Sequence, residues 1–175
     1  MKKKKTIILI SSFSLVVIVL LSVTLLELNA RHKKYCEKVL SDYAIIEKSD
    51  IYEAIEILEK YTNSRNEDRL LIELLAKASY VNNELDKSEY LYKKAVVEDY
   101  LCQEYKPDEK LINIANAQVH LMLSAIYKRK GDVDKQIIQT EKAMKQIEKL
   151  GENINSQQIF EHLKTITFQN LDKFP

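Results

Sequence analysis

The chain has 175 residues, of which 46% are hydrophobic and 30% charged, and its formal net charge is +1. Abundant apolar residues and a small net charge exclude a disordered chain, and the length suits one domain. The only two glycines, Gly131 and Gly151, exclude glycine-rich phosphate loops, dinucleotide fingerprints and a nucleophile elbow. So few turn-forming residues also argue against a sheet of short strands. The composition therefore predicts an all-α protein.

The N-terminus combines a basic tail with a long apolar segment. Residues 1–5 include four lysines, and residues 6–26 form a run without a charged side chain. As a helix, this run reaches about 30 Å, the thickness of the hydrocarbon core of a bilayer. We therefore predict a transmembrane signal-anchor helix over residues 6–27, in contact with lipid. A cleaved signal peptide is one alternative, but its apolar core is ordinarily shorter and a small-residue cleavage motif is missing. A buried helix of a soluble protein is the other alternative.

The charges on either side of the apolar segment predict its orientation. Four lysines precede it, and Arg31, Lys33 and Lys34 follow it. Basic residues are enriched on the cytoplasmic side of spanning helices, which favours a cytoplasmic N-terminus by a narrow margin. The high ratio of lysine to arginine, with much isoleucine and asparagine, is typical of an AT-rich bacterial genome. We expect a single-pass protein of the bacterial inner (cytoplasmic) membrane, with residues 31–175 outside the cytoplasm.

Beyond the apolar segment, hydrophobic residues recur at helical spacing with few interruptions. Asp50 is suited to cap a helix, and Asn83 and Gly131 are suited to left-handed turns. Pro107 is expected in the first turn of a helix, and Ser156 is expected to cap another. The predicted helices cover residues 33–48, 50–62, 67–83, 84–101, 108–130, 132–150 and 156–170.

Two parts of this helical region align without a gap. Residues 75–95 match residues 123–143, so that each residue of the first segment corresponds to the one 48 positions later. The matched pairs include Leu75 with Leu123, Ala76 with Ser124, Asn83 with Gly131, Leu85 with Val133 and Ala95 with Ala143. An earlier copy of the second helix lies 34 residues before Leu85, Ser88, Tyr92 and Ala95, as Ile51, Ala54, Leu58 and Tyr61.

On these residues the chain resembles the tetratricopeptide repeat (TPR) family, whose 34-residue unit pairs two antiparallel helices. The resemblance implies a short TPR-like α-solenoid of about three helical hairpins over residues 31–175. Small residues in such a unit let its helices approach closely, and large ones fill the space between neighbours. Departures from the pattern are Ser79, Gln136 and Thr140, and an insertion follows Ala95. The implied copies lie near 35–66, 69–100 and 117–150, with a capping helix over 156–171.

The sequence offers no arrangement typical of catalysis. His32, His120 and His162 are far apart and match no metal-binding spacing. Nucleic-acid binding is not expected, because residues 31–175 carry a net charge of −2 and the whole chain has four arginines. We predict neither an enzyme, a cofactor, a metal nor a small-molecule substrate. Cys36 and Cys102 form no CxxC motif, and whether they pair in a disulfide stays open.

The leading functional hypothesis is a membrane-anchored protein–protein interaction module, a scaffold or adaptor at the cell envelope. The TPR resemblance implies a concave surface, made by the first helix of each pair, that holds a peptide or a partner protein. Basic residues there would bind a carboxylate, and Tyr80 would pack against an apolar side chain. The alternatives are a generic array of helical hairpins for the fold and a self-associating subunit of a membrane complex for the function. The candidate groove residues are Leu70, Glu73, Lys77, Tyr80, Val81, Gln118, Leu121, Ala125, Lys128 and Arg129.

Overall fold

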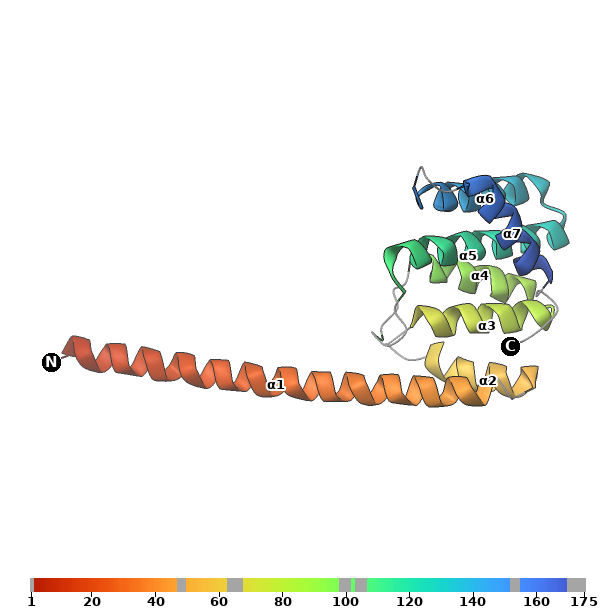
Figure 1. Cartoon of the computed structure of the whole chain (residues 1–175). Helices are drawn as coiled ribbons and strands as arrows, with labels where there is room; N and C mark the ends of the chain where they lie inside the picture. Colours follow the sequence, from red (N-terminus) through yellow and green to blue (C-terminus); the bar gives the residue numbers. More distant parts are fainter. Residues whose placement is uncertain are drawn as a thin grey trace. The chain divides into compact units, whose positions relative to one another are not determined.

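The computed structural model describes residues 2–46, 50–62, 68–97, 102, 107–151 and 155–169, without the side chains of 2–21, 43, 61 and 62. These residues form seven α-helices and no strand, which confirms the all-α prediction (Figure 1). The chain divides into two compact units, Met1–Ser41 and Asp42–Pro175. The helices are α1 (Lys2–Ile46), α2 (Ile51–Thr62), α3 (Arg69–Val81), α4 (Leu85–Ala95), α5 (Glu109–Lys130), α6 (Val133–Glu148) and α7 (Ser156–Gln169).

Helix α1 runs through 45 residues without a break. The sequence predicted two helices here, one over 6–27 and one over 33–48, and the separation between them was wrong. The connecting residues contain neither glycine nor proline, and Glu27 pairs with Arg31 one turn later at 3.7 Å, a spacing that supports a helix.

Among the residues that the structure describes, no helix is both long enough and apolar enough to cross a bilayer.

At the starts of most helices of the second unit, an acidic or amide side chain accepts hydrogen bonds from backbone N–H groups. Asp50 accepts from the backbone N–H of Tyr52 and Glu53 at 2.9 and 3.0 Å, which confirms it as a cap. Asp108 caps α5, so Pro107 lies before the cap and not in the first turn as predicted. Asn155, rather than Ser156, caps α7 by accepting from the N–H of Gln158 at 3.1 Å. Both errors are shifts of one or two residues, and the helices themselves are present.

Two helix ends repeat the same turn 48 residues apart. After α3, Asn83 has a left-handed φ of 62°, and the N–H of Glu84 donates to the carbonyl of Ser79 at 2.8 Å. After α5, Gly131 has a φ of 76°, and the N–H of Asp132 donates to the carbonyl of Tyr127 at 2.9 Å. This is the Schellman arrangement, which closes a helix with a left-handed residue. The equivalence of the two turns, predicted from the sequence, is confirmed.

In the second unit each helix from α2 to α6 packs against the next, and α7 packs against both α5 and α6 (Figure 1). The α3–α4 contact is close because its residues are small: Ser88 and Ala76 are both fully buried, and the Ser88 hydroxyl donates to the Ala76 carbonyl at 2.7 Å. A second polar contact joins α5 to α6, where Ser124 and Thr140 are 2.9 Å apart. The core between α5, α6 and α7 contains Ala117, Leu121, Ala143, Ile147, Leu150, Phe160 and Leu163.

A charged cluster links α4 to the C-terminal end of α5. Glu89 accepts hydrogen bonds from Lys93 within α4 and from Lys130 and the Tyr127 hydroxyl of α5. Burial of Glu89 opposes its ionisation, but the hydrogen bonds from Lys130, Lys93 and Tyr127 outweigh it and lower the pKa from 4.5 to about 2. The ionised carboxylate is therefore the form that holds the two helices together.

This cluster predicts a stability that depends on acid pH. A folded-state pKa below the unfolded one stabilises the fold above about pH 4.5, and the contribution disappears as the pH falls toward 2. Because the carboxylate keeps some solvent contact, we expect about 2 kcal/mol. Urea unfolding between pH 7 and pH 2.5 should show this loss in the natural chain and a smaller one in Glu89→Gln. Equal pH slopes for the two chains would contradict the role of Glu89.

Candidate functional site

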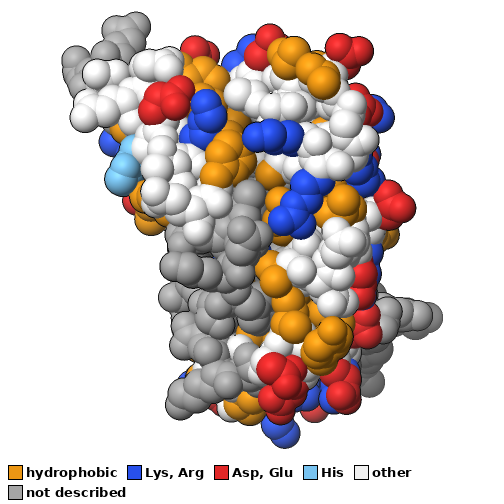
Figure 2. Space-filling view, turned by 90° about the vertical axis from the view of Figure 1, so that its right-hand side faces the viewer, with side chains coloured by type: hydrophobic (Ala, Val, Ile, Leu, Met, Phe, Trp, Pro, Cys, Tyr) orange, Lys and Arg blue, Asp and Glu red, His pale blue; other side chains and the backbone are white. Residues whose placement is uncertain are grey.

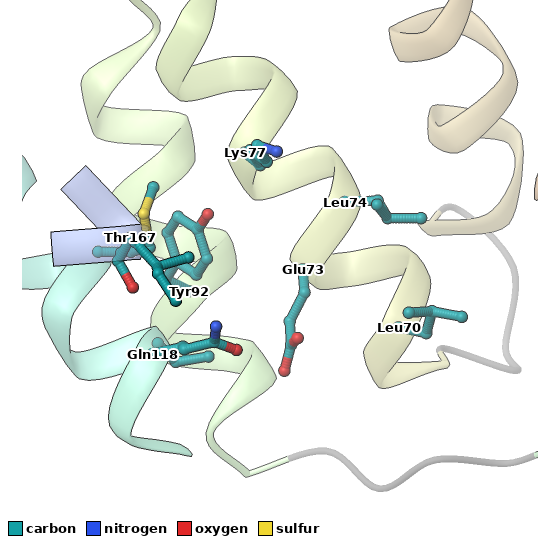
Figure 3. A pocket seen from close by; sticks show the side chains of 10 residues that line it. Leu70, Glu73, Leu74, Lys77, Tyr92, Gln118 and Thr167 are labelled. Atoms are coloured by element: carbon teal, nitrogen blue, oxygen red, sulfur yellow. The ribbon is translucent and has the colours of Figure 1, made fainter. Parts of the chain in front are cut away.

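The first cavity lies between α3, α5 and α7 and has a volume of about 270 Å³. Glu73 and Lys77 project from the same face of α3, while Tyr92, Gln118 and Thr167 come from α4, α5 and α7 (Figure 3). The spacing of four residues places Glu73 and Lys77 one turn apart on the helix. The remaining lining is mainly apolar: Leu70, Leu74, Val119, Met122 and Ile166.

Glu73 is compensated by a neighbour on its own helix. The guanidinium Nε of Arg69 donates to Glu73 Oε1 at 2.7 Å, and the Arg69 side chain is buried. Burial raises the pKa of Glu73, and Arg69 only partly opposes this rise. Burial also raises the pKa of the nearby Tyr92 hydroxyl well above its usual value, with further contributions from Glu73 and Tyr80. The acidic group of the cavity therefore adds little uncompensated negative charge.

Lys77 is the basic group of the first cavity. It is half-buried, and burial alone lowers its pKa. Removing a lysine side chain from water without supplying an opposite charge disfavours its charged form. An anionic group placed in this cavity would favour the positively charged form of Lys77 and would be attracted to it.

The second cavity has a volume of about 390 Å³ and is lined by Tyr80, Ala125, Lys128, Arg129 and Phe168. The guanidinium of Arg129 lies over the ring of Tyr80, 4.1 Å from its centre. Arginine guanidinium groups are attracted to the faces of aromatic rings in this way. Lys128 is exposed beside it. Two basic side chains therefore border this cavity, but Tyr80 is itself 2% exposed. The prediction that Tyr80 offers its ring to an apolar side chain of a partner is wrong, because burial and the Arg129 guanidinium cover the ring.

The second cavity continues the first along α3 and α5. Lys77 and Met122 line the first cavity, and the residues three positions later on the same helix faces, Tyr80 and Ala125, line the second. We call the two together the α3–α5 groove. The last turn of α5 contains three basic residues. Lys128 and Arg129 line the second cavity, whereas Lys130 pairs with Glu89 of α4. In Figure 2, basic side chains gather beside hydrophobic ones in the upper half of the face shown, the height at which α5 and α6 lie in Figure 1.

The structure brings together most of the groove residues predicted from the sequence. Four of them line the first cavity and four line the second. Leu121 is the clearest exception: it is fully buried in the core between α5, α6 and α7 and lines neither cavity. Val81, at the end of α3, also lies outside both linings. The residues in place are Leu70, Glu73, Lys77 and Gln118, then Tyr80, Ala125, Lys128 and Arg129.

Sequence reasoning missed the contribution of α7 to the groove. It assigned this helix only to capping the array, whereas Ile166, Thr167 and Phe168 line the two cavities. The apolar residues of α7 extend along the helix to its end, beyond what the core between α5, α6 and α7 requires. These additional apolar residues were the feature of the sequence from which a contact of α7 outside the core could have been predicted. Leu74 was also missed, although it lies one turn from Leu70 on the same face of α3 and could have been found from that spacing.

The histidines and cysteines considered in the sequence analysis form no metal-binding arrangement among the described residues. His120 is buried, and its Nδ1 lies 2.9 Å from Gln139 Oε1; burial lowers its pKa. Among the described residues no group of histidine, cysteine, aspartate or glutamate side chains is arranged to hold a metal ion. Cys36 and Cys102 are both buried and both disulfide-bonded. The insertion that follows Ala95, residues 96–110, lies largely outside the described residues.

Comparisons of the chain with protein-family models, with curated proteins and with solved structures returned no match.

Proposed function

We propose that the chain is a membrane-anchored, TPR-like interaction module that binds a protein or peptide partner in the α3–α5 groove. One observation carries the proposal. Eight of the ten residues that the repeat register assigned to a concave binding surface line two cavities in the fold. A groove of this kind, apolar with a few polar groups, is the usual form of a binding site.

The repeat geometry supports the TPR-like part of the proposal. The Schellman turns at Asn83 and Gly131 are equivalent at the 48-residue offset, and the small residues Ala76 and Ser124 are both buried at equivalent places. Stacked helical hairpins leave a continuous surface along their first helices. In this chain those helices are α3 and α5, whose side chains face the groove.

The charges of the groove indicate the chemistry of its partner. Glu73 is paired with Arg69. Lys77 lines the first cavity and Lys128 lines the second, where Arg129 stacks on Tyr80. Charge-assisted hydrogen bonds to such residues are stronger than neutral ones. A partner segment with a carboxylate and a neighbouring apolar side chain matches both features of the surface.

Membrane anchoring rests on the uncharged run over residues 6–26 and on its place inside the continuous helix α1. Confining a binding module to a membrane raises its effective concentration toward partners in the same membrane. The charges on either side of the run favour a cytoplasmic N-terminus, and hence an extracytoplasmic position for residues 31–175. The inner membrane of a bacterium, with a cytoplasmic N-terminus, fits both features.

A second candidate function is self-association, and one surface favours it. Val133, Ile137 and Ile138 on α6 are 60%, 51% and 47% exposed. Apolar side chains gathered on one helix face are typical of protein contacts. Sedimentation of residues 31–175 over a wide concentration range would distinguish the two candidates, since a monomer at high concentration excludes assembly through this face.

The groove is tested by reversing its charge. The double variant Lys128→Glu with Arg129→Glu should lower the recovery of the co-purified partner about tenfold or more, because charged hydrogen bonds contribute about 1.5–3 kcal/mol. The measurement is affinity purification from cells in mild detergent, with quantification of what co-purifies. Lys142→Glu with Lys145→Glu, on the exposed side of α6, is the matched control. Unchanged recovery from a folded double variant would remove the groove from the account.

A further inference from the structure

Helix α7 has two parts with different surroundings. Phe160 and Leu163, in its first half, are buried in the core between α5, α6 and α7. Its last turn instead lines the groove, with Ile166 and Thr167 at the first cavity and Phe168 at the second. Ile166 and Phe168 each keep 37% exposure. The helix is thus anchored by one half and lies in the groove with the other.

The last turn fits the groove incompletely. Cavities of about 270 and 390 Å³ remain beside it. The Thr167 hydroxyl is buried in the first cavity without a hydrogen-bond partner among the described residues. A buried hydroxyl that has lost water without gaining a partner weakens the contact it belongs to. These features describe an occupant that a better-fitting segment can replace.

We propose that the last turn of α7 is a built-in occupant of the α3–α5 groove, and that a partner binds by displacing it. The inference rests on the proposed function, since it assumes that a partner uses this groove. The anchored half of α7 need not move, because the core contacts end at Leu163. Helix ends open at lower free energy than whole helices, so the displacement can be local. Affinity for a partner is then reduced by the fraction of molecules in which the turn is seated.

The occupancy can be measured without knowing the partner. Lys77 lines the same cavity as Ile166 and Thr167, so its acetylation by limiting acetic anhydride reports whether the turn is seated. Three full-length or shortened chains are compared: the natural chain, one ending at Thr165 and one ending at Gln169. Lys145, exposed on α6, is the internal reference. Peptide mass spectrometry gives the ratio of modification at Lys77 to that at Lys145.

We expect the ratio to rise about threefold or more in the chain ending at Thr165, as the population with an open groove becomes dominant. It should stay unchanged in the chain ending at Gln169. The full-length double variant Ile166→Asp with Phe168→Asp should reproduce the rise without shortening, while His162→Asp, on the exposed side of α7, should not. An unchanged ratio in both the shortened chain and the double variant would overturn the proposal. A rise already in the chain ending at Gln169 would assign the occupancy to residues 170–175 and overturn it as stated.

Partner recovery completes the test. If displacement is required, the Ile166→Asp with Phe168→Asp variant should recover several times more partner than the natural chain. Equal recovery, with a raised Lys77 ratio, would overturn displacement and leave the proposed function intact. Recovery that is insensitive to Lys128→Glu with Arg129→Glu would instead contradict the proposed function, whatever the Lys77 ratio.

Discussion

Replacing Leu121 by alanine is expected to lower the free energy of unfolding by about 3 kcal/mol, the usual cost of emptying a leucine site in a packed core. Leu121 is fully buried among Ala117, Ala143, Ile147 and Phe160, so α5, α6 and α7 would all lose contacts. The midpoint of thermal unfolding should fall by about 10 °C. Circular dichroism of the chain lacking residues 1–30 would measure both changes.

Leu111→Ala is the matched control on the same helix. Leu111 is 52% exposed, and exposed substitutions usually change stability by about 0.5 kcal/mol or less. The pair separates two assignments of Leu121. If Leu121 belongs to the core, Leu121→Ala will be much less stable than Leu111→Ala. If it belongs to the groove, Leu121→Ala will lower partner recovery and the two variants will be equally stable. The second result would contradict the placement of Leu121 in the core.

Lysine in place of both Val16 and Val19 is expected to release the protein from the membrane. Each lysine at the centre of a spanning helix costs about 2.5–3.5 kcal/mol of insertion free energy, and together they exceed what the short serine-containing run 6–26 can offset. After alkaline carbonate treatment, the natural chain should sediment with the membrane and the double variant should remain in the supernatant.

The control for this variant is Val16→Leu with Val19→Leu, which keeps the apolar character of the run. It should sediment with the membrane as the natural chain does. If carbonate released the natural chain as readily as the lysine variant, residues 6–27 would not be a spanning segment. Protease access in spheroplasts then tests the orientation, since residues 31–175 should be digested without lysis.

Several helix ends could be predicted closely from the sequence because their stop signals are local. The helix predicted over 84–101 is the exception, since α4 ends at Ala95. Asn83 and Gly131 are residues that tolerate left-handed backbone, and both adopt it. The errors at these helix starts were equally local: Asp108 caps α5, so Pro107 precedes the helix, and Asn155 caps α7 in place of the predicted Ser156. Several capping residues stand next to each other at these points, and the sequence does not rank them.

The residues that α3 and α5 contribute to the groove could be predicted from the sequence, whereas those that α7 contributes could not. A repeat register assigns Lys77 and Lys128 to equivalent faces because it depends on spacing along α3 and α5 alone. The register failed at Leu121, since a face that borders the groove also borders the core that α7 completes. The course of α7 depends on how several helices pack together, which no local pattern encodes. The contribution of Phe168 to the second cavity therefore became visible only in the fold.

The central claim, that the groove holds a protein partner, is tested most directly by photo-crosslinking in cells from a photoreactive phenylalanine analogue at Lys128. The account predicts one discrete crosslinked product of a second protein, absent when the analogue replaces Lys145 on α6 and weakened by Lys77→Glu in the first cavity. No product from Lys128, or the same products from Lys128 and Lys145, would contradict it. A product made only of two copies of this chain would support the self-association candidate instead.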